Sequence, residues 1–179
     1  MNHYAESKLL FDNYYRCHMA KIKSQVSGLR YFNVYGPRES HKEGMFSVIY
    51  SFFCQLEKCN HIKLLEGSHG YDDGEQRRDF IHVEDTIKVK KWLMHNNVSG
   101  IFNVGTGKSR SFNDVAKNVI SVLKKGRIEY IEFPDGLKEQ YQSYTQADMS
   151  NLINSGYDND FLSLEEGIER YVKWLESHK

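Results

Sequence analysis

Residues 77–86 read Arg-Arg-Asp-Phe-Ile-His-Val-Glu-Asp-Thr, and this stretch shows how the chain is built. Residues 79–83 combine aromatic and branched side chains, which favours a short strand. Residues 84–95 follow without a turn and read as a helix with charges on its outer face. A strand that passes into a helix is the unit from which α/β proteins are made.

The same alternation extends outward in both directions. Before this stretch, the sequence predicts a helix over 4–22, a buried strand over 26–32, a helix over 45–58 and a strand over 62–65, with loops at 36–37 and 67–75. After it, the sequence predicts strands over 101–104 and 128–133. Two more helices begin at Ser111 and Ser163, where Asp114 and Glu166 complete capping signatures. The predicted fold class is therefore α/β with parallel strands.

Composition excludes several classes of protein. The 24 basic residues balance 24 acidic ones, so neither a nucleic acid nor a membrane surface is indicated as a partner. No apolar run is long enough to span a bilayer, and the first residues lack the pattern of a signal peptide. Cys17, Cys54 and Cys59 are odd in number and fit no metal-ligand spacing. They predict reduced thiols in a cytoplasmic protein, and no metal site.

Close to its first residue the chain reads Tyr4-Ala-Glu-Ser-Lys8. Residues four apart on a helix lie one turn above the other, which brings the Lys8 ammonium beside the Tyr4 phenol. A neighbouring cation favours the phenolate form, so the pair is suited to moving a proton on and off an alcohol. The same spacing also arises by chance, with a surface lysine above a half-buried tyrosine.

Together with residues 30–38, Arg-Tyr-Phe-Asn-Val-Tyr-Gly-Pro-Arg, and residues 77–86, this pair resembles the extended short-chain dehydrogenase/reductase family of nucleotide-sugar epimerases and dehydratases. Within that family, four further segments resemble the ADP-glycero-manno-heptose 6-epimerase subfamily. These segments are residues 39–45, 65–68, 102–107 and 141–148. The resemblance extends over essentially the whole chain, but over only the second half of such an enzyme.

The resemblance implies the C-terminal part of a Rossmann-like fold, with late parallel strands and a small substrate-binding domain. Residues 1–44 would end the Rossmann-like core and carry the Tyr4 helix. Residues 45–179 would be mainly substrate-binding, with a returning core strand and helices. The N-terminal dinucleotide-binding half would be absent, either by truncation or because it is a separate chain.

The resemblance also implies an enzyme that inverts C6 of ADP-glycero-manno-heptose with bound NADP, or NAD, for lipopolysaccharide core heptose synthesis. Such an enzyme would be cytoplasmic and homo-oligomeric, with an ADP-sugar as its partner. A carbon that carries a hydroxyl but no acidic proton can be inverted by transient oxidation, and each face then needs an acid/base group. Two alternatives stay open. They are another NAD(P)-dependent nucleotide-sugar epimerase or dehydratase, and a fragment that binds a nucleotide sugar without catalysis.

Particular residues carry these implied roles. Tyr4 and Lys42 would be the two acid/base groups, and Lys8 would hold the nicotinamide ribose. Val34, through its backbone, and Lys42 would also contact the cofactor. On residue types alone, Lys42 is one solvated charge in a polar loop.

Arg78 is the predicted ligand of the substrate diphosphate, because a guanidinium can donate two hydrogen bonds to phosphate oxygens. Arg77 is the alternative residue for this role. The loop at 67–75 is longer than the family suggests, which predicts an insertion. The resemblance places the following residues around the sugar and nucleotide: Asn33, Gly44, Ser51, Leu65, Glu66, Gly67, Ser68 and Tyr141.

Gly105-Thr106-Gly107 is the only G-x-G in the chain. It lacks the third glycine of a dinucleotide-binding loop and the acidic residue at the expected distance, so we interpret it as a tight turn. His82 is interpreted as a structural histidine. Four large apolar residues are predicted to belong to the core: Phe32, Ile49, Phe53 and Trp92.

Overall fold

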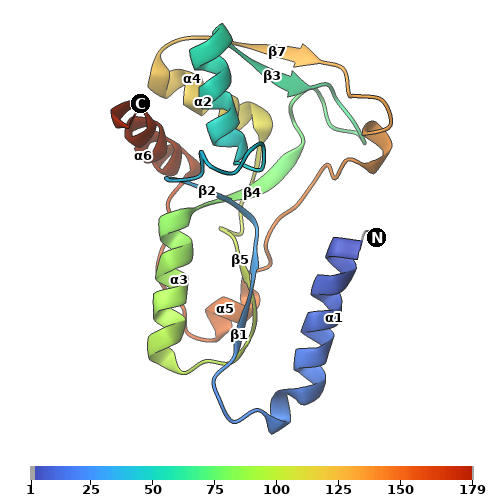
Figure 1. Cartoon of the computed structure of the whole chain (residues 1–179), viewed down its shortest axis with the longest axis vertical. Coiled ribbons are helices and arrows are strands. Elements are labelled where there is room, and N and C mark those ends of the chain that lie inside the picture. The colour runs from blue at the N-terminus through green and yellow to red at the C-terminus, as the bar shows by residue number, and fades with distance from the viewer. Residues whose placement is uncertain (1–2, 179) are drawn as a thin grey trace.

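The computed structural model of the protein describes residues 3–178. Figure 1 shows an elongated molecule whose two ends are joined by the middle strands β2 and β4. One end contains α1 (His3–His18), η1 (Met19–Lys21), β1 (Ser27–Tyr31), α3 (Val83–Asn96), β5 (Gly100–Val104) and α5 (Ser150–Asn154). The other contains α2 (Val48–Cys59), β3 (His61–Leu65), α4 (Phe112–Leu123), β7 (Arg127–Ile131) and α6 (Leu164–Ser177). The remaining elements are β2 (Asn33–Tyr35), β4 (Arg77–His82), β6 (Ser109–Ser111) and η2 (Lys138–Gln140).

Three small sheets carry the strands, and most pairs are parallel. β1 pairs with β5, β2 with β4, and β3 with β7, all in parallel, whereas β6 runs antiparallel to β4. The parallel pairs are separated in sequence by helices, which is how parallel strands are usually connected. This confirms the predicted α/β class.

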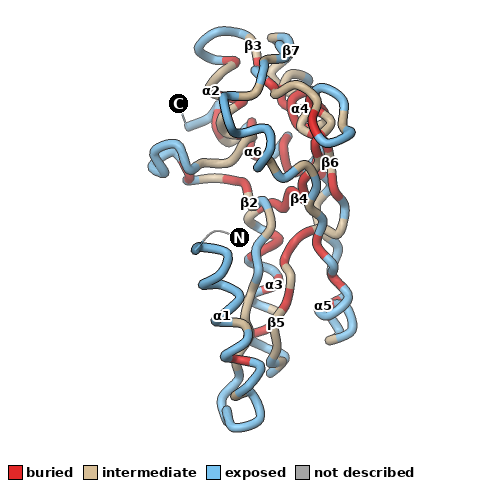
Figure 2. Tube along the Cα trace, turned by 90° about the vertical axis from the view of Figure 1, so that its right-hand side faces the viewer, coloured by how far each residue is buried: buried red, intermediate tan, exposed pale blue. Residues whose placement is uncertain are grey.

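β4 divides two hydrophobic cores. Its residue Phe80 belongs to a core with Ile49, Phe52 and Tyr171, whereas the next residue, Ile81, belongs to a second core formed with α3, β5 and the segment 147–157. Successive residues of a strand point to opposite faces, so one strand can contribute to both cores. Figure 2 shows β4 as a largely buried stretch at the centre of the molecule. All the side chains of β4 after Arg77 are therefore buried.

α1 is packed less closely than the other long helices. Tyr15 is its only buried residue, and the helix is mostly exposed in Figure 2. Two contacts hold it against β1 and the segment before it. The Arg30 guanidinium pairs with the Asp12 carboxylate, and the Tyr15 hydroxyl donates to the Val26 carbonyl at 3.3 Å. Tyr4 and Lys8 lie on this helix.

Most predicted elements are present, with shifted ends. Both capping boxes form, at Ser111 with Asp114 and at Ser163 with Glu166. The predicted helix over 4–22 stops at His18 and continues only as a short 3-10 turn. The predicted strand over 26–32 breaks at Phe32. β6 and α5 were missed, because three and five residues are too few to show a periodic pattern.

The turn at Gly105-Thr106-Gly107 is built around a buried carboxylate. Asp79 on β4 accepts hydrogen bonds from the backbone N–H groups of Thr106 (2.7 Å), Gly107 (2.9 Å) and Ala147 (3.0 Å). A Cβ at Gly105 would lie only 2.7 Å from an Asp79 oxygen, so no side chain fits there. The amides that a dinucleotide phosphate would need are thus already engaged, in agreement with a structural turn.

His82 has a structural role, although only one of its nitrogens is satisfied. Its Nδ1 accepts from the Glu84 N–H at 3.3 Å and caps α3. Its Nε2 is buried and has no hydrogen-bond partner among residues 3–178. Burial lowers the pKa of His82, against the raising effects of the Glu84 and Asp85 carboxylates.

Candidate active site

A cavity of about 300 Å³ lies where β2 meets the loop 36–47. Asn33, Val34 and Lys42, three residues with predicted roles, all contribute to its wall. The other lining residues are mostly apolar: Phe32, Glu39, Met45, Phe46, Ser47, Val48, Phe80 and Phe112. The structure therefore gathers part of the predicted site into one small pocket.

β2 reaches this pocket because the chain changes partner at Phe32. The Phe32 N–H still donates to the Val104 carbonyl at 3.1 Å, which continues the pairing of β1 with β5. From Asn33 onward the chain pairs instead with β4, where Asn33 lies opposite Phe80. This switch brings Asn33 and Val34 to the cavity wall.

Lys42 is presented by two consecutive turns of the loop. The Lys42 N–H donates to the Glu39 carbonyl at 3.1 Å, and the Met45 N–H donates to the Lys42 carbonyl at 2.8 Å. The second turn requires left-handed backbone at Glu43 (φ 39°) and at Gly44 (φ 88°), a conformation that glycine adopts without strain. The Lys42 side chain is 47% exposed, and its ammonium lies 4.0 Å from a Glu39 carboxylate oxygen.

Arg78 on β4 is a buried cation held by aromatic rings. Its guanidinium carbon lies 5.7 Å from the centroid of the Phe112 ring and 5.3 Å from that of Tyr141. One terminal nitrogen donates to the Arg77 carbonyl at 2.9 Å. Within residues 3–178, no carboxylate lies within 4.0 Å of it. Burial lowers the pKa of Arg78, an effect that Tyr141 opposes. Such a guanidinium is available to an anion.

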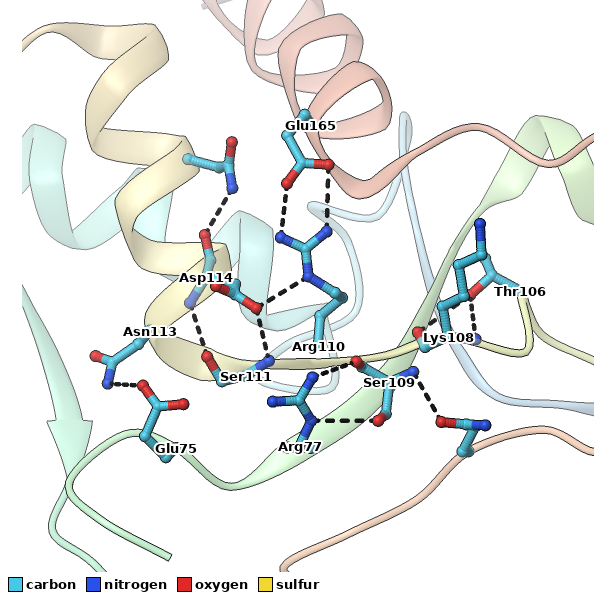
Figure 3. Close-up of polar contacts among 12 residues, drawn as sticks. Glu75, Arg77, Thr106, Lys108, Ser109, Arg110, Ser111, Asn113, Asp114 and Glu165 are labelled. Carbon is cyan, nitrogen blue, oxygen red and sulfur yellow. Dashed lines mark hydrogen bonds and ion pairs between the residues drawn. The ribbon is translucent and has the colours of Figure 1, made fainter.

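Arg77, the neighbour of Arg78, is engaged elsewhere. Figure 3 shows its guanidinium directed to Ser109, with Nε donating to the hydroxyl at 3.3 Å and a terminal nitrogen donating to the carbonyl at 2.7 Å. Neighbouring residues of a strand point to opposite faces, so only Arg78 meets the Tyr141 ring. In the same view Arg110 bridges Asp114 and Glu165, which ties α4 to α6.

The predicted pair on α1 lies outside the cavity wall. The Lys8 ammonium lies 5.3 Å from the centroid of the Tyr4 ring, in the close arrangement that the spacing predicts. Tyr4 is 71% exposed. Gly44 and Ser51 also stand apart from the cavity lining, and the Ser51 hydroxyl accepts from Gln55 at 3.1 Å.

A second, wider cavity of about 850 Å³ is lined by Glu66, Gly67 and Ser68, with the loop that follows them. Leu65 does not line it and ends β3. Lys138 reaches into this region and pairs with Glu66 at 2.7 Å. Three of the residues predicted around the sugar and nucleotide, Glu66 to Ser68, therefore lie at a separate pocket from Lys42.

Glu39 and Phe112 belong to the cavity but were not predicted as site residues. Glu39 stands among exposed polar residues, and no local pattern distinguishes a buried carboxylate from a solvated one. Phe112 opens α4, far along the chain from β2. Only the tertiary fold brings it against Arg78.

Residues 1–105, more than half of the chain, match the sequence model of the NAD dependent epimerase/dehydratase family. The chain belongs to this family. The match supports a nicotinamide cofactor for members of the family, and it agrees with the Rossmann-like α/β fold.

Similar proteins place the chain more closely within the family. It is 53% identical over 173 residues to the ADP-L-glycero-D-manno-heptose-6-epimerase of Alkalilimnicola ehrlichii, covering 96% of this chain and 54% of the relative. It is 47% identical over 191 residues to the protein of the same name from Thiobacillus denitrificans, covering 98% and 58%. The chain thus spans about half the length of the curated relatives it matches.

Solved structures of family members superpose well on it. The crystal structure of Helicobacter pylori ADP-L-glycero-D-manno-heptose-6-epimerase matches 98% of this chain and 52% of its own, with a TM-score of 0.81 and 31% identity. UDP-N-acetylglucosamine 4-epimerase from Methanobrevibacter ruminantium also gives a TM-score of 0.81, at 27% identity over 98% of this chain and 54% of its own.

Two features are absent from the part of the chain that the structure describes. None of the helices in residues 3–178 is both long and apolar enough to cross a membrane. The same residues contain no group of three or more histidine, cysteine, aspartate or glutamate side chains arranged to hold a metal ion.

Proposed function

We propose that this chain is the substrate-binding and acid/base half of an ADP-glycero-manno-heptose 6-epimerase. One observation carries the proposal. Lys42, Asn33 and Val34 share a cavity with Phe112, and the same Phe112 ring packs against the unpaired guanidinium of Arg78. The pocket therefore has the amine of Lys42 at one wall and the buried cation of Arg78 behind the Phe112 ring. Such a pocket suits a sugar joined to a diphosphate.

Lys42 and Tyr4 are the proposed acid/base groups. Each would take the proton of the C6 hydroxyl when that carbon is oxidised and return a proton to the oxygen when it is reduced, one group for each orientation of the sugar. Lys42 is supported by its place in the cavity wall. Tyr4 is supported by the ammonium of Lys8 beside its ring.

A nicotinamide cofactor, when bound, would supply reversible hydride transfer at C6. Lys8, Val34 and Lys42 would hold its nicotinamide end. The backbone N–H groups of Thr106 and Gly107 already donate to Asp79, so this turn would not hold the pyrophosphate of the cofactor. We propose NADP as the cofactor, with NAD as the alternative.

Arg78 is the proposed ligand of the diphosphate, and Tyr141 flanks it. A guanidinium can donate two parallel hydrogen bonds to phosphate oxygens, and burial strengthens each bond by excluding water. The remaining proposed contacts to sugar and nucleotide are Asn33, Gly44, Ser51, Leu65, Glu66, Gly67 and Ser68. Three of these, Glu66 to Ser68, line the wider cavity, which has room for a nucleoside.

The wider biological role rests on the resemblance and on the names of the relatives. We propose that the enzyme serves lipopolysaccharide core heptose synthesis, in the cytoplasm and as a homo-oligomer. A second candidate function is inversion or dehydration of another nucleotide sugar, because structural relatives with similar TM-scores include a UDP-sugar 4-epimerase.

A chimera tests the function directly. This chain would replace the matching 54% of the Alkalilimnicola ehrlichii relative. NMR would follow the ratio of C6 epimers of ADP-glycero-manno-heptose, with UDP-glucose as the competing substrate. The proposal predicts inversion of the ADP-heptose only. Turnover of UDP-glucose alone would establish the second candidate, and retention of ADP-sugars without turnover would identify a non-catalytic binding fragment.

A further inference from the structure

Glu39 is a buried carboxylate in an otherwise exposed loop. Within residues 38–45, all of which the structure describes, it alone is buried, with 3% of its surface exposed. One carboxylate oxygen accepts from the Ser47 N–H at 2.6 Å. The other accepts from the Ser47 hydroxyl at 2.6 Å and from the Tyr171 hydroxyl at 2.8 Å. A carboxylate with this many donors is held firmly in place.

These donors belong to two helices of the same core. Ser47 is the N-cap of α2, and its hydroxyl also accepts from the Tyr50 N–H at 3.3 Å. Tyr171 lies on α6 and is fully buried. Burial first, and then Glu39, raises the pKa of Tyr171, so its hydroxyl keeps the proton that it donates. Glu39 therefore joins the loop to α2 and to the C-terminal helix at one point.

Lys42 depends on Glu39 in two ways. Its N–H donates to the Glu39 carbonyl, which fixes the turn between the two residues. Its ammonium faces the Glu39 carboxylate at 4.0 Å, the only acidic group within that distance among the described residues. Both side chains line the 300 Å³ cavity.

We propose that Glu39 is the positioning residue of Lys42: it anchors the loop to α2 and α6 and directs the ammonium into the cavity. The role of Lys42 in catalysis rests on the proposed function, whereas the anchoring of its loop can be tested without it. Tyr171 contributes to the position of Lys42 indirectly, because its hydroxyl donates a hydrogen bond to the Glu39 carboxylate.

Three variants separate the contributions. Glu39→Gln keeps the shape of the side chain. Its amide oxygen can accept from the Ser47 N–H while its amino group donates to the two hydroxyls, so these contacts are kept with two of them reversed, and the charge facing Lys42 is lost. Tyr171→Phe keeps that charge and removes one hydrogen bond. Asp85→Asn is the matched control, since Asp85 is also a buried carboxylate that holds the C-terminal part of the chain, through the Leu162 N–H at 2.9 Å, but outside the cavity.

In the active chimera, Glu39→Gln should lower kcat about tenfold to a hundredfold and leave KM nearly unchanged, because misplacing a catalytic group by about 1 Å can cost that much. Tyr171→Phe should lower kcat less. The double variant of Glu39→Gln with Lys42→Met should be no slower than Lys42→Met alone, since both act through one group. The proposal would be overturned if the losses of kcat from Glu39→Gln and Lys42→Met multiplied in the double variant. It would also be overturned if Asp85→Asn lowered kcat as much as Glu39→Gln.

Amide hydrogen exchange gives a readout that needs no activity. Glu39→Ala should speed exchange at the Lys42, Met45 and Ser47 amides, whereas Asp85→Asn should leave those three amides unchanged. A chimera that turns over no nucleotide sugar would refute the proposed function but not the anchor. Unchanged exchange at these amides in Glu39→Ala would refute the anchor itself.

Discussion

The Arg78 guanidinium lies 5.3 Å from the centre of the Tyr141 ring, and within residues 3–178 no carboxylate pairs with it. Tyr141 comes from the segment that follows η2, and Arg78 comes from the central strand β4. A buried arginine without an acid is costly unless something else meets its charge. The aromatic rings meet part of it, and an anionic ligand would meet the rest.

Replacing Arg78 by lysine should weaken binding of the ADP-sugar, because an ammonium cannot match two oxygens in a plane. Losing a charge-assisted hydrogen bond costs about 1.5–3 kcal/mol, so KM should rise about tenfold to a hundredfold, with kcat little changed. Steady-state kinetics of the chimera would measure both constants. Arg77→Lys is the control, and it should lower thermal stability through lost bonds to Ser109 without raising KM. A larger KM effect at Arg77 would contradict the assignment.

Asp79 should matter for folding and not for chemistry. Asp79→Ala would leave the N–H groups of Thr106, Gly107 and Ala147 without their acceptor. Each such loss costs about 1–3 kcal/mol, so the free energy of unfolding should fall by about 3 kcal/mol or more. Urea titration measures this, and Asp135→Ala, at an exposed position, should change it by less than about 0.5 kcal/mol. Equal stability of the two variants would mean that the hydrogen bonds of Asp79 do not stabilise this turn.

The stability of the protein should fall below neutral pH in part because of His82. Burial lowers the pKa of its imidazole in the folded state, so the unfolded chain takes up the proton more readily. His82 therefore stabilises the fold above its unfolded pKa of about 6.5, and this contribution is lost as pH falls below that value. His82→Asn retains an N-cap for α3 but does not titrate. Between pH 7.5 and pH 5, the free energy of unfolding measured by urea titration should fall less in His82→Asn than in the unmodified protein. An equal fall in both proteins would contradict the prediction.

The chain by itself should bind a nicotinamide dinucleotide weakly. A pyrophosphate needs free backbone N–H groups at a glycine-rich turn, and those of Thr106 and Gly107 donate to Asp79. Calorimetry with NADP and with NAD should show no binding tighter than about 1 μM. The chimera serves as the positive control. Submicromolar binding of either dinucleotide by the chain would contradict this prediction. It would show that the chain contains a pyrophosphate-binding site other than the Gly105–Gly107 turn.

The sequence predicted the fold well where the signals were local. Capping residues such as Ser111 and Ser163 act on amides three residues away, so they can be read without knowing the fold. The break at Phe32 could not be read, because it arises where the chain stops pairing with β5 and begins to pair with β4, and both strands lie far along the chain. β6 was missed for the same reason: three residues become a strand only through pairing with β4.

In the candidate site, too, contacts between residues near in sequence could be predicted, and contacts between distant residues could not. The Tyr4 and Lys8 contact follows from helical spacing, and it forms. The burial of Glu39 does not follow from any spacing, because it requires Tyr171 from the far end of the chain. The proposed choice of Arg78 over Arg77 likewise rests on contacts with Phe112 and Tyr141, which lie distant in sequence.

In the proposed mechanism, Lys42 and Tyr4 serve opposite faces of one carbon. The most direct measurement compares Lys42→Met and Tyr4→Phe in the chimera, using epimerisation of the ADP-heptose together with reduction of an aldehyde analogue. Each variant should lose epimerase activity about a hundredfold to ten-thousandfold, and each should still form one C6 epimer in the half-reaction, not the same one. Near-normal epimerisation by Lys42→Met would contradict the account and return Lys42 to the role of a solvated loop charge.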